Sequence, residues 1–232
     1  MALKILGIST SPRGKANSYY LLERALERAR EGLEDTEVDV YTFEEKTFSG
    51  CIHCYGCRKK GNCVVEDDFQ DLAQRWMGAD IIIYSVPVYH MSIPGQLKCF
   101  IDRLGQSGFT KLAPGQGQAG MTKLLKCIGI ISQGMHIFSG QEHAITELVN
   151  HALIMGCLPI AGNLPESYVG AGGWTENLRD KGAIEHLNAE GTISARAAVA
   201  AAESLGQNVA HLARIIQAGR RALSTRLERE IS

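Results

Sequence analysis

Four cysteines crowd into one short segment of the chain: Cys51, Cys54, Cys57 and Cys63. They fall within thirteen residues, with the spacing C-x2-C-x2-C-x5-C, in a chain that has seven cysteines in all. No secretory signal is visible at the N-terminus, so this crowding indicates metal or redox chemistry before structural disulfides. The remaining three cysteines lie in apolar surroundings and are expected to be small core residues: Cys99, Cys127 and Cys157.

The spacing suits an iron-sulfur cluster better than a zinc ion. Three thiolates at positions i, i+3 and i+6 can wrap around a cubane, and Gly61-Asn62 supplies a turn that could return the fourth. Structural zinc sites usually pair two short knuckles across a longer spacer, which this segment lacks, but zinc stays open as the competing metal. His53 lies inside the motif and is expected to stay outside the ligand set.

Basic residues accompany the cysteines, because Arg58, Lys59 and Lys60 follow Cys57 directly. Their charge would offset the negative charge of a thiolate-ligated cluster. It would equally depress the pKa of free thiols and make them reactive. The segment is therefore compatible with a cluster and with free redox-active cysteines.

A loop rich in hydroxyls follows the first apolar run. Residues 9–18 offer serine and threonine side chains, the cation of Arg13 and the amides of a predicted helix N-terminus, which together suit a phosphate. The loop is neither a Walker A sequence nor a GxGxxG fingerprint, so a terminal phosphate monoester fits better than a Mg-nucleotide or a dinucleotide. Simple turn and capping roles are the alternative. The candidate residues are Ser9, Ser11, Arg13, Asn17 and Ser18.

Two later loops could hold a planar ring. Residues 87–94 carry a proline at each end, and residues 132–136 could supply amide donors and access through small side chains. The alternatives are that Tyr89 only packs and that His90 and His136 are exposed histidines with no catalytic duty. The candidate residues are Pro87, Val88, Tyr89, His90, Met91, Ser132, Gln133 and Gly134.

Alternating strands and helices must position these loops. The periodicity predicts strands at 3–9, 37–43, 79–88, 124–132 and 158–168, and helices at 18–32, 67–77, 94–104, 140–155 and 194–216. With right-handed crossovers, this alternation predicts an α/β fold: a doubly wound parallel sheet of five strands between two helical layers. Ligands of such sheets bind at the carboxyl ends of the strands, where all three polar loops begin.

We expect a single domain over residues 1–218, with a cysteine loop at 48–66 and an insertion at 170–193. Long insertions of this kind are more often functional or interface-forming than idle. Residues 219–232 are basic and are expected to form a solvated helical tail, with a partner-binding arm as the alternative.

The composition excludes several classes of function. The chain has 24 Lys+Arg against 25 Asp+Glu, a formal charge of −1, so no basic surplus predicts nucleic-acid binding. Apolar residues make up 45% and charged residues 21%, which excludes disorder as the main state. No apolar run is long enough to span a membrane, and a cytoplasmic location is expected.

The sequence resembles the NAD(P)H-dependent FMN reductase group of flavodoxin-like proteins. The resemblance rests on Ser9-Thr-Ser-Pro-Arg with Asn17-Ser18, and on Pro87-Val-Tyr89 with Pro94-Gly-Gln-Leu-Lys-Cys-Phe-Ile-Asp-Arg103. It implies a flavodoxin-like fold that binds FMN non-covalently, with the phosphate at residues 9–18 and the ring between the 87–91 and 132–134 loops. Asp102 and Arg103 are expected to make structural pairs, since they lie at the far end of the predicted helix.

The cysteine segment narrows this resemblance to the iron-sulfur flavoproteins, a branch of the same group. The resemblance implies one [4Fe-4S] cluster per subunit, held by Cys51, Cys54, Cys57 and Cys63, beside FMN. It also implies a homo-oligomer, a homodimer or homotetramer, with ferredoxin or NAD(P)H as electron donor and a small-molecule acceptor. No catalytic acid or base is needed, because the cofactors carry the chemistry.

Three functions compete at this point. The first is an FMN-dependent oxidoreductase that moves electrons between a donor and an acceptor through FMN and the cluster. An iron-free NAD(P)H-dependent FMN or quinone reductase would share the fold and the FMN site. A non-catalytic flavodoxin-like carrier is the third, and the nearly neutral charge argues against it, because dedicated carriers commonly dock through a surface of one sign.

Overall fold

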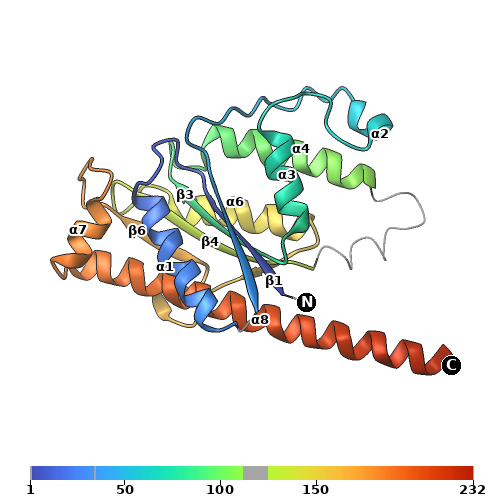
Figure 1. Cartoon of the computed structure of the whole chain (residues 1–232). Coiled ribbons are helices and arrows are strands. Elements are labelled where there is room, and N and C mark those ends of the chain that lie inside the picture. Colours follow the sequence, from blue (N-terminus) through green and yellow to red (C-terminus); the bar gives the residue numbers. More distant parts are fainter. Residues whose placement is uncertain (1, 34, 112–124, 232) are drawn as a thin grey trace.

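The computed structural model describes residues 2–33, 35–111 and 125–231, and this part of the chain forms a parallel sheet between two helical layers (Figure 1). The sheet order is β2-β1-β3-β4-β5, with β6 also paired to β4. This order confirms the predicted doubly wound α/β fold, in which the chain reverses its direction of winding between β1 and β3. The strands are β1 Leu3–Ser9, β2 Thr36–Thr42, β3 Ile81–Pro87, β4 Cys127–Gly134, β5 Leu158–Ile160 and β6 Ala171–Trp174.

The position of each strand in the sheet explains its sequence pattern. Every residue of β3 and β4 is buried, because both strands are central and covered by helices on both faces. In β2, at the edge, more and less exposed residues alternate. The parallel register pairs Ser9 with Ser85, and Ser85 with Ile131, so the carboxyl ends of β1, β3 and β4 lie together.

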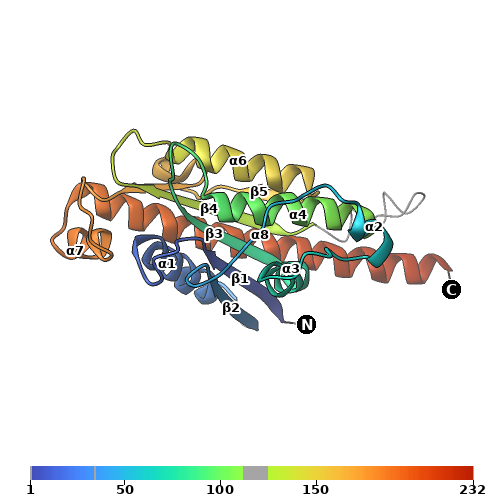
Figure 2. The ribbon, with the colours of Figure 1, turned by 90° about the horizontal axis from the view of Figure 1, so that it is seen from above.

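The helices cover the two faces in separate sets, as the two views show (Figures 1 and 2). Helices α1, α7 and α8 share one hydrophobic cluster with one face of the sheet, and α3, α4 and α6 share a second cluster with the other. Helix α8 packs very closely on α1: a Cβ at Gly206 would lie 2.0 Å from the carbonyl oxygen of Ala25. The helices are α1 Asn17–Glu31, α2 Gly56–Lys60, α3 Phe69–Gly78, α4 Gly95–Lys111, α6 Gln141–Ile154, α7 Ala183–Ala189 and α8 Ile193–Ile231.

The last edge of the sheet differs from the prediction of one strand over 158–168. Strand β5 ends at Ile160, and the next segment folds on itself through a bond from the Gly162 amide to the Ser167 carbonyl (2.9 Å). Pro165, which has no N–H to donate to a strand, begins a short 3₁₀ helix there. Strand β6 then takes the free place beside β4, inside the segment that we predicted to be an insertion.

Helix α8 continues without a break through residue 219, where the separate tail was predicted to begin. Its C-terminal part extends past the end of the sheet (Figure 1). Among the described residues, no helix combines the length and the apolar character needed to cross a membrane. The start of the strand predicted at 124–132 lies outside the described residues at position 124.

A buried histidine should make the fold sensitive to acid. His151 of α6 lies between the rings of Trp76 and Tyr84, and burial lowers the pKa of His151 to about 4, partly offset by Asp102. Below pH 6.5 the unfolded chain binds a proton at His151 that the folded protein does not bind. His151 should therefore lower the free energy of unfolding by about 3 kcal/mol between neutral pH and pH 4. Urea unfolding at several pH values should show a shallower loss for His151→Leu. The exposed His211→Leu is the control, and equal pH slopes in all three proteins would contradict this assignment.

Candidate functional site

An open cleft of about 480 Å³ lies at the carboxyl ends of β1, β3 and β4. Three loops that leave these strands, together with a segment after β6, form its walls. Of the residues predicted from the sequence, Ser11, Arg13, Asn17, Pro87, Val88, Tyr89, Gln133 and Gly134 line it. The prediction missed five lining residues: Ala16, Met135, Thr175, Leu178 and Arg179.

The loop from β1 to α1 has the features of an anion site. Helix α1 begins after Ala16, whose side chain cannot cap the helix, so the first amides of α1 lack a side-chain partner. The first turn contains no acid that would compete for an anion. The hydroxyls of Ser9 and Thr10 are buried at the base of the loop and have no hydrogen-bond partner in the described structure. Such unpaired buried donors suit a ligand oxygen.

The loop after β3 makes a tight turn that leaves some of its predicted site residues in the cleft and carries the others out of it. The amide of Tyr89 donates to the carbonyl of Ser92 (2.9 Å), the amide of Ser92 donates back (3.0 Å), and both central residues have positive φ. Those residues, His90 and Met91, are exposed at the tip and do not line the cleft. Pro87, Val88 and Tyr89 do line it, so the side chains that face the cleft lie before the turn.

The loop after β4 is fixed from two sides. Gln133 Nε2 donates to the hydroxyl of Ser18 (3.2 Å), which ties this loop to the first turn of α1. Gly140, with φ of 101°, leaves room for the tight turn, since a Cβ there would lie 2.7 Å from the backbone of Met91. Ser132 and Ser18 are buried behind the lining residues, and the Ser132 hydroxyl has no partner in the described structure.

The cysteine loop lies on α4, away from the cleft. Cys51, Cys54, Cys57 and Cys63 are free and line one small pocket with Arg103 and Gln106. Figure 1 shows α2, which includes Cys57, near the end of α4 that is remote from the cleft. Arg103 and Gln106 lie about 12 to 17 Å along α4 from its first residue, Gly95.

Arg103 is buried beneath this loop and holds it. Its Nε donates to Cys63 Sγ (3.3 Å), its Nη1 to both carboxylate oxygens of Asp67 (2.7 and 2.8 Å), and its Nη2 to the Val65 carbonyl (2.5 Å). Burial alone would lower the pKa of Arg103, but the bonds to Asp67 and Cys63 raise it, so the guanidinium stays charged. The neighbouring Asp102 pairs with Lys98. Asp102 and Arg103 therefore each make a structural ion pair, as expected.

In the described part of the chain, no three Cys, His, Asp or Glu side chains are close enough to hold a metal ion. The four thiols therefore share a pocket without forming a finished metal site. Their chemistry still fits a cluster: four free thiols surround one space, with a permanent cation hydrogen-bonded to one of the sulfurs.

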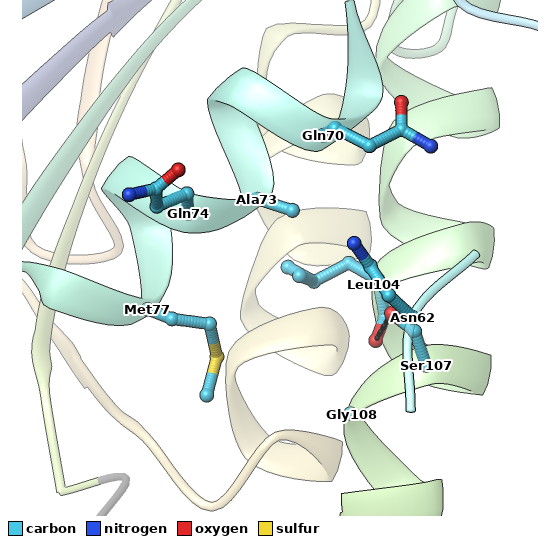
Figure 3. Close-up of a pocket in the computed structure, with 8 residues that line it drawn as sticks. All are labelled: Asn62, Gln70, Ala73, Gln74, Met77, Leu104, Ser107 and Gly108. Atoms are coloured by element: carbon cyan, nitrogen blue, oxygen red, sulfur yellow. Dashed lines mark hydrogen bonds between the residues drawn. The ribbon is translucent and has the colours of Figure 1, made fainter. Parts of the chain in front are cut away.

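A second hollow, of about 320 Å³, lies between α3 and α4 beside the cysteine loop (Figure 3). Gln70, Gln74 and Asn62 contribute amides, and the rest of the lining is apolar apart from Ser107. No acid, base or thiol is among its described lining residues, so the hollow offers no reactive group.

The fold and the cleft define a doubly wound α/β protein with an open, polar-lined cleft at its strand ends. The chain belongs to the NADPH-dependent FMN reductase family, whose model matches residues 3–166. It is thus a flavin-dependent oxidoreductase, as predicted.

Similar proteins agree with this family. An iron-sulfur flavoprotein of Archaeoglobus fulgidus is 30% identical over 75% of this chain and 83% of its own. An iron-sulfur flavoprotein of Methanocaldococcus jannaschii is 29% identical over 74% of this chain and 82% of its own. An FMN-dependent NADH:quinone oxidoreductase of Pseudomonas syringae pv. tomato is 26% identical over 71% of this chain and 87% of its own. Among solved structures, an NAD(P)H:quinone oxidoreductase of Methanothermobacter marburgensis has the same fold, with a TM-score of 0.58 and 12% identity, covering 90% of this chain and all of that one.

Proposed function

We propose that the protein transfers electrons from NAD(P)H or ferredoxin to a small-molecule acceptor through FMN in the cleft and a [4Fe-4S] cluster in the cysteine loop. The observation that carries the proposal is the combination, in one chain, of the flavin-family cleft with four free cysteines around one pocket. The names of similar proteins, iron-sulfur flavoproteins among them, support the same combination.

In the cleft, residues 9–18 hold the FMN phosphate and the flavin ring lies between the 87–89 and 133–135 backbones. The unpaired Ser9 and Thr10 hydroxyls and the uncapped start of α1 support this placement of the phosphate. Bound FMN supplies hydride and electron chemistry, and the chain's part is to bind it, orient it and leave one side open to the donor and acceptor. His90 and Met91 are exposed at the tip of the turn after Tyr89, outside the cleft lining, and are candidates to contact those molecules as they approach.

The phosphate placement predicts the effect of a double substitution. Replacing Ser11 with Ala and Arg13 with Gln should weaken FMN binding by about 2 kcal/mol or more, because charge-assisted contacts to the phosphate are lost. Fluorescence titration of the apoprotein with FMN measures the change. The exposed Arg196→Gln, on α8, is the control for the loss of one positive charge. An unchanged FMN affinity in the double variant would show that the phosphate binds elsewhere.

In the cysteine loop, Cys51, Cys54, Cys57 and Cys63 are the proposed ligands. A [4Fe-4S] cluster supplies one-electron transfer, which complements the two-electron chemistry of a nicotinamide. Arg103 provides a buried positive charge toward the negatively charged thiolates. Arg58, within the loop, adds an exposed positive charge and stacks at 4.3 Å over the ring of Tyr55. Because the cysteine loop and the cleft are far apart along α4, we further propose a homodimer or homotetramer that brings the loop of one chain to the cleft of another.

An anaerobic reduction experiment tests this function. The full chain should be reduced separately by NADPH, NADH and reduced ferredoxin, while flavin absorbance and the electron paramagnetic resonance of a reduced cluster are recorded. The proposal predicts that at least one donor reduces both centres and that a quinone reoxidises both. Flavin reduction with no paramagnetic signal from any donor would contradict the electron path through a cluster.

One observation favours a second candidate, an iron-free NAD(P)H-dependent FMN or quinone reductase. The described side chains include no ready-made group of three metal ligands. This candidate predicts full steady-state turnover of NAD(P)H in protein that contains FMN and no iron.

A further inference from the structure

The segment that follows β6 forms part of the wall of the cleft and bonds to two of its loops. We call residues 175–184 the strap. On one side, the amide of Thr175 donates to the Gly134 carbonyl (3.1 Å) and the amide of Asn177 to the Met135 carbonyl (2.9 Å). The strap begins with a tight turn in which Glu176 and Asn177 both have positive φ. It therefore has a defined conformation against the loop after β4.

On its other side the strap is bonded to the phosphate loop. Arg13 Nη2 donates to the carbonyl of Arg179 (2.9 Å). The buried side-chain amide of Asn17 bonds to two later positions of the strap. Its Nδ2 donates to the Asp180 carbonyl (3.0 Å), and its Oδ1 accepts from the Ile184 amide (2.9 Å). Asn17 thus acts as a positioning residue that fixes the strap to the first turn of α1.

The strap changes the charge of the cleft. Arg13 and Arg179 are the only charged side chains among its described lining residues, and no carboxylate lines it. Arg179 is exposed, and in the described structure its guanidinium has no hydrogen-bond or ion-pair partner. Two positive charges match a phosphate monoester, which carries close to two negative charges at neutral pH.

We propose that the strap is part of the flavin site and that Arg179 and Arg13 together clamp the 5′-phosphate of FMN. The inference rests on the proposed binding of FMN in this cleft and adds a residue that lies outside the part of the chain matched by the family, residues 3–166. The segment after β6 thereby adds a second cation to the cleft, because Lys15, the other cation of residues 9–18, lies over the Tyr19 ring and is not among the described lining residues. A guanidinium can bind two phosphate oxygens at once, which distinguishes it from a point charge.

The test compares FMN with riboflavin, which lacks the phosphate. Apoprotein of the full chain is titrated with each flavin, for the native sequence and for Arg179→Gln, Arg179→Lys and the control Arg196→Gln. Arg179→Gln should raise the dissociation constant for FMN about tenfold or more and leave that for riboflavin unchanged. Arg179→Lys should recover part of the loss, and Arg196→Gln should bind both flavins normally.

Three results would overturn the inference. Equal weakening of FMN and riboflavin would make the strap a purely structural support. Unchanged binding of both flavins, with a KM increase for NADPH and not for NADH, would assign Arg179 to the donor's phosphate. Unchanged binding of both flavins and both donors would remove Arg179 from the site. A native protein that binds neither flavin would instead overturn the proposed function itself, so the two failures are distinguishable.

Discussion

Replacing Cys57 with Ala should abolish iron and sulfide binding and leave FMN in place. Four thiolates hold a [4Fe-4S] cluster, and the pocket formed by this loop offers no spare cysteine among its described lining residues. The flavin cleft is built by other loops, at the opposite end of α4, so its affinity for FMN should not change. The iron and sulfide contents, measured on anaerobically purified protein, should fall from about four of each per chain to near zero. Flavin should remain near one per chain.

Cys99→Ala is a matched control for this substitution. Cys99 is also a free, partly buried thiol, and its sulfur packs within 4 Å of the position that a Cβ on Gly50 would take, next to the loop. It lies outside the four-cysteine motif, so its loss should leave the iron content intact. Full iron retention in Cys57→Ala would remove Cys57 from the ligand set. Equal iron loss in both variants would indicate a general disturbance of the loop.

The second large effect is expected at Arg103. Arg103→Met removes one partner of a buried ion pair and leaves the Asp67 carboxylate, 7% exposed, without its cation. Breaking such a pair typically costs about 3 to 5 kcal/mol. The bonds to the Ser49 and Val65 carbonyls are lost as well, so the two ends of the cysteine loop lose their common anchor. Urea unfolding should therefore show a large loss of stability, accompanied by lower iron content.

A double substitution separates the charge from the packing. Arg103→Met with Asp67→Asn should recover part of the stability, because no unpaired charge is left buried. The iron content should stay low, since the hydrogen bond to Cys63 Sγ is still missing. The surface pair Lys98–Asp102 is the control, and Asp102→Asn should cost less than about 1 kcal/mol. A loss below about 1 kcal/mol for Arg103→Met alone would contradict the anchoring role.

The parts of the site that follow directly from a strand end could be predicted from the sequence. Apolar runs located β1 and β4, and Arg13 and Gln133, which follow the runs predicted at 3–9 and 124–132, line the cleft. Local backbone geometry was harder to predict. His90 and Met91 leave the cleft because a two-residue turn with positive φ carries them outward, and neither residue is a glycine that would have indicated such a turn.

Long-range contacts could not be predicted from spacing. Asn17 and Asp180 are far apart in sequence, and their bond depends on β6 completing the sheet edge that β5 leaves unfinished. The length of the insertion indicated a functional segment but did not identify Arg179. In the same way, the cysteine spacing located the loop but did not reveal that Arg103, forty residues further along the chain, lies beneath Cys63.

The central claim is that one chain holds both FMN and an iron-sulfur cluster. Purification under strict exclusion of oxygen, followed by measurement of flavin, iron and sulfide per chain, tests it most directly. We predict about one FMN, four iron atoms and four sulfides per chain. Stoichiometric FMN with iron and sulfide near zero would contradict the claim and leave the iron-free reductase as the function of this protein.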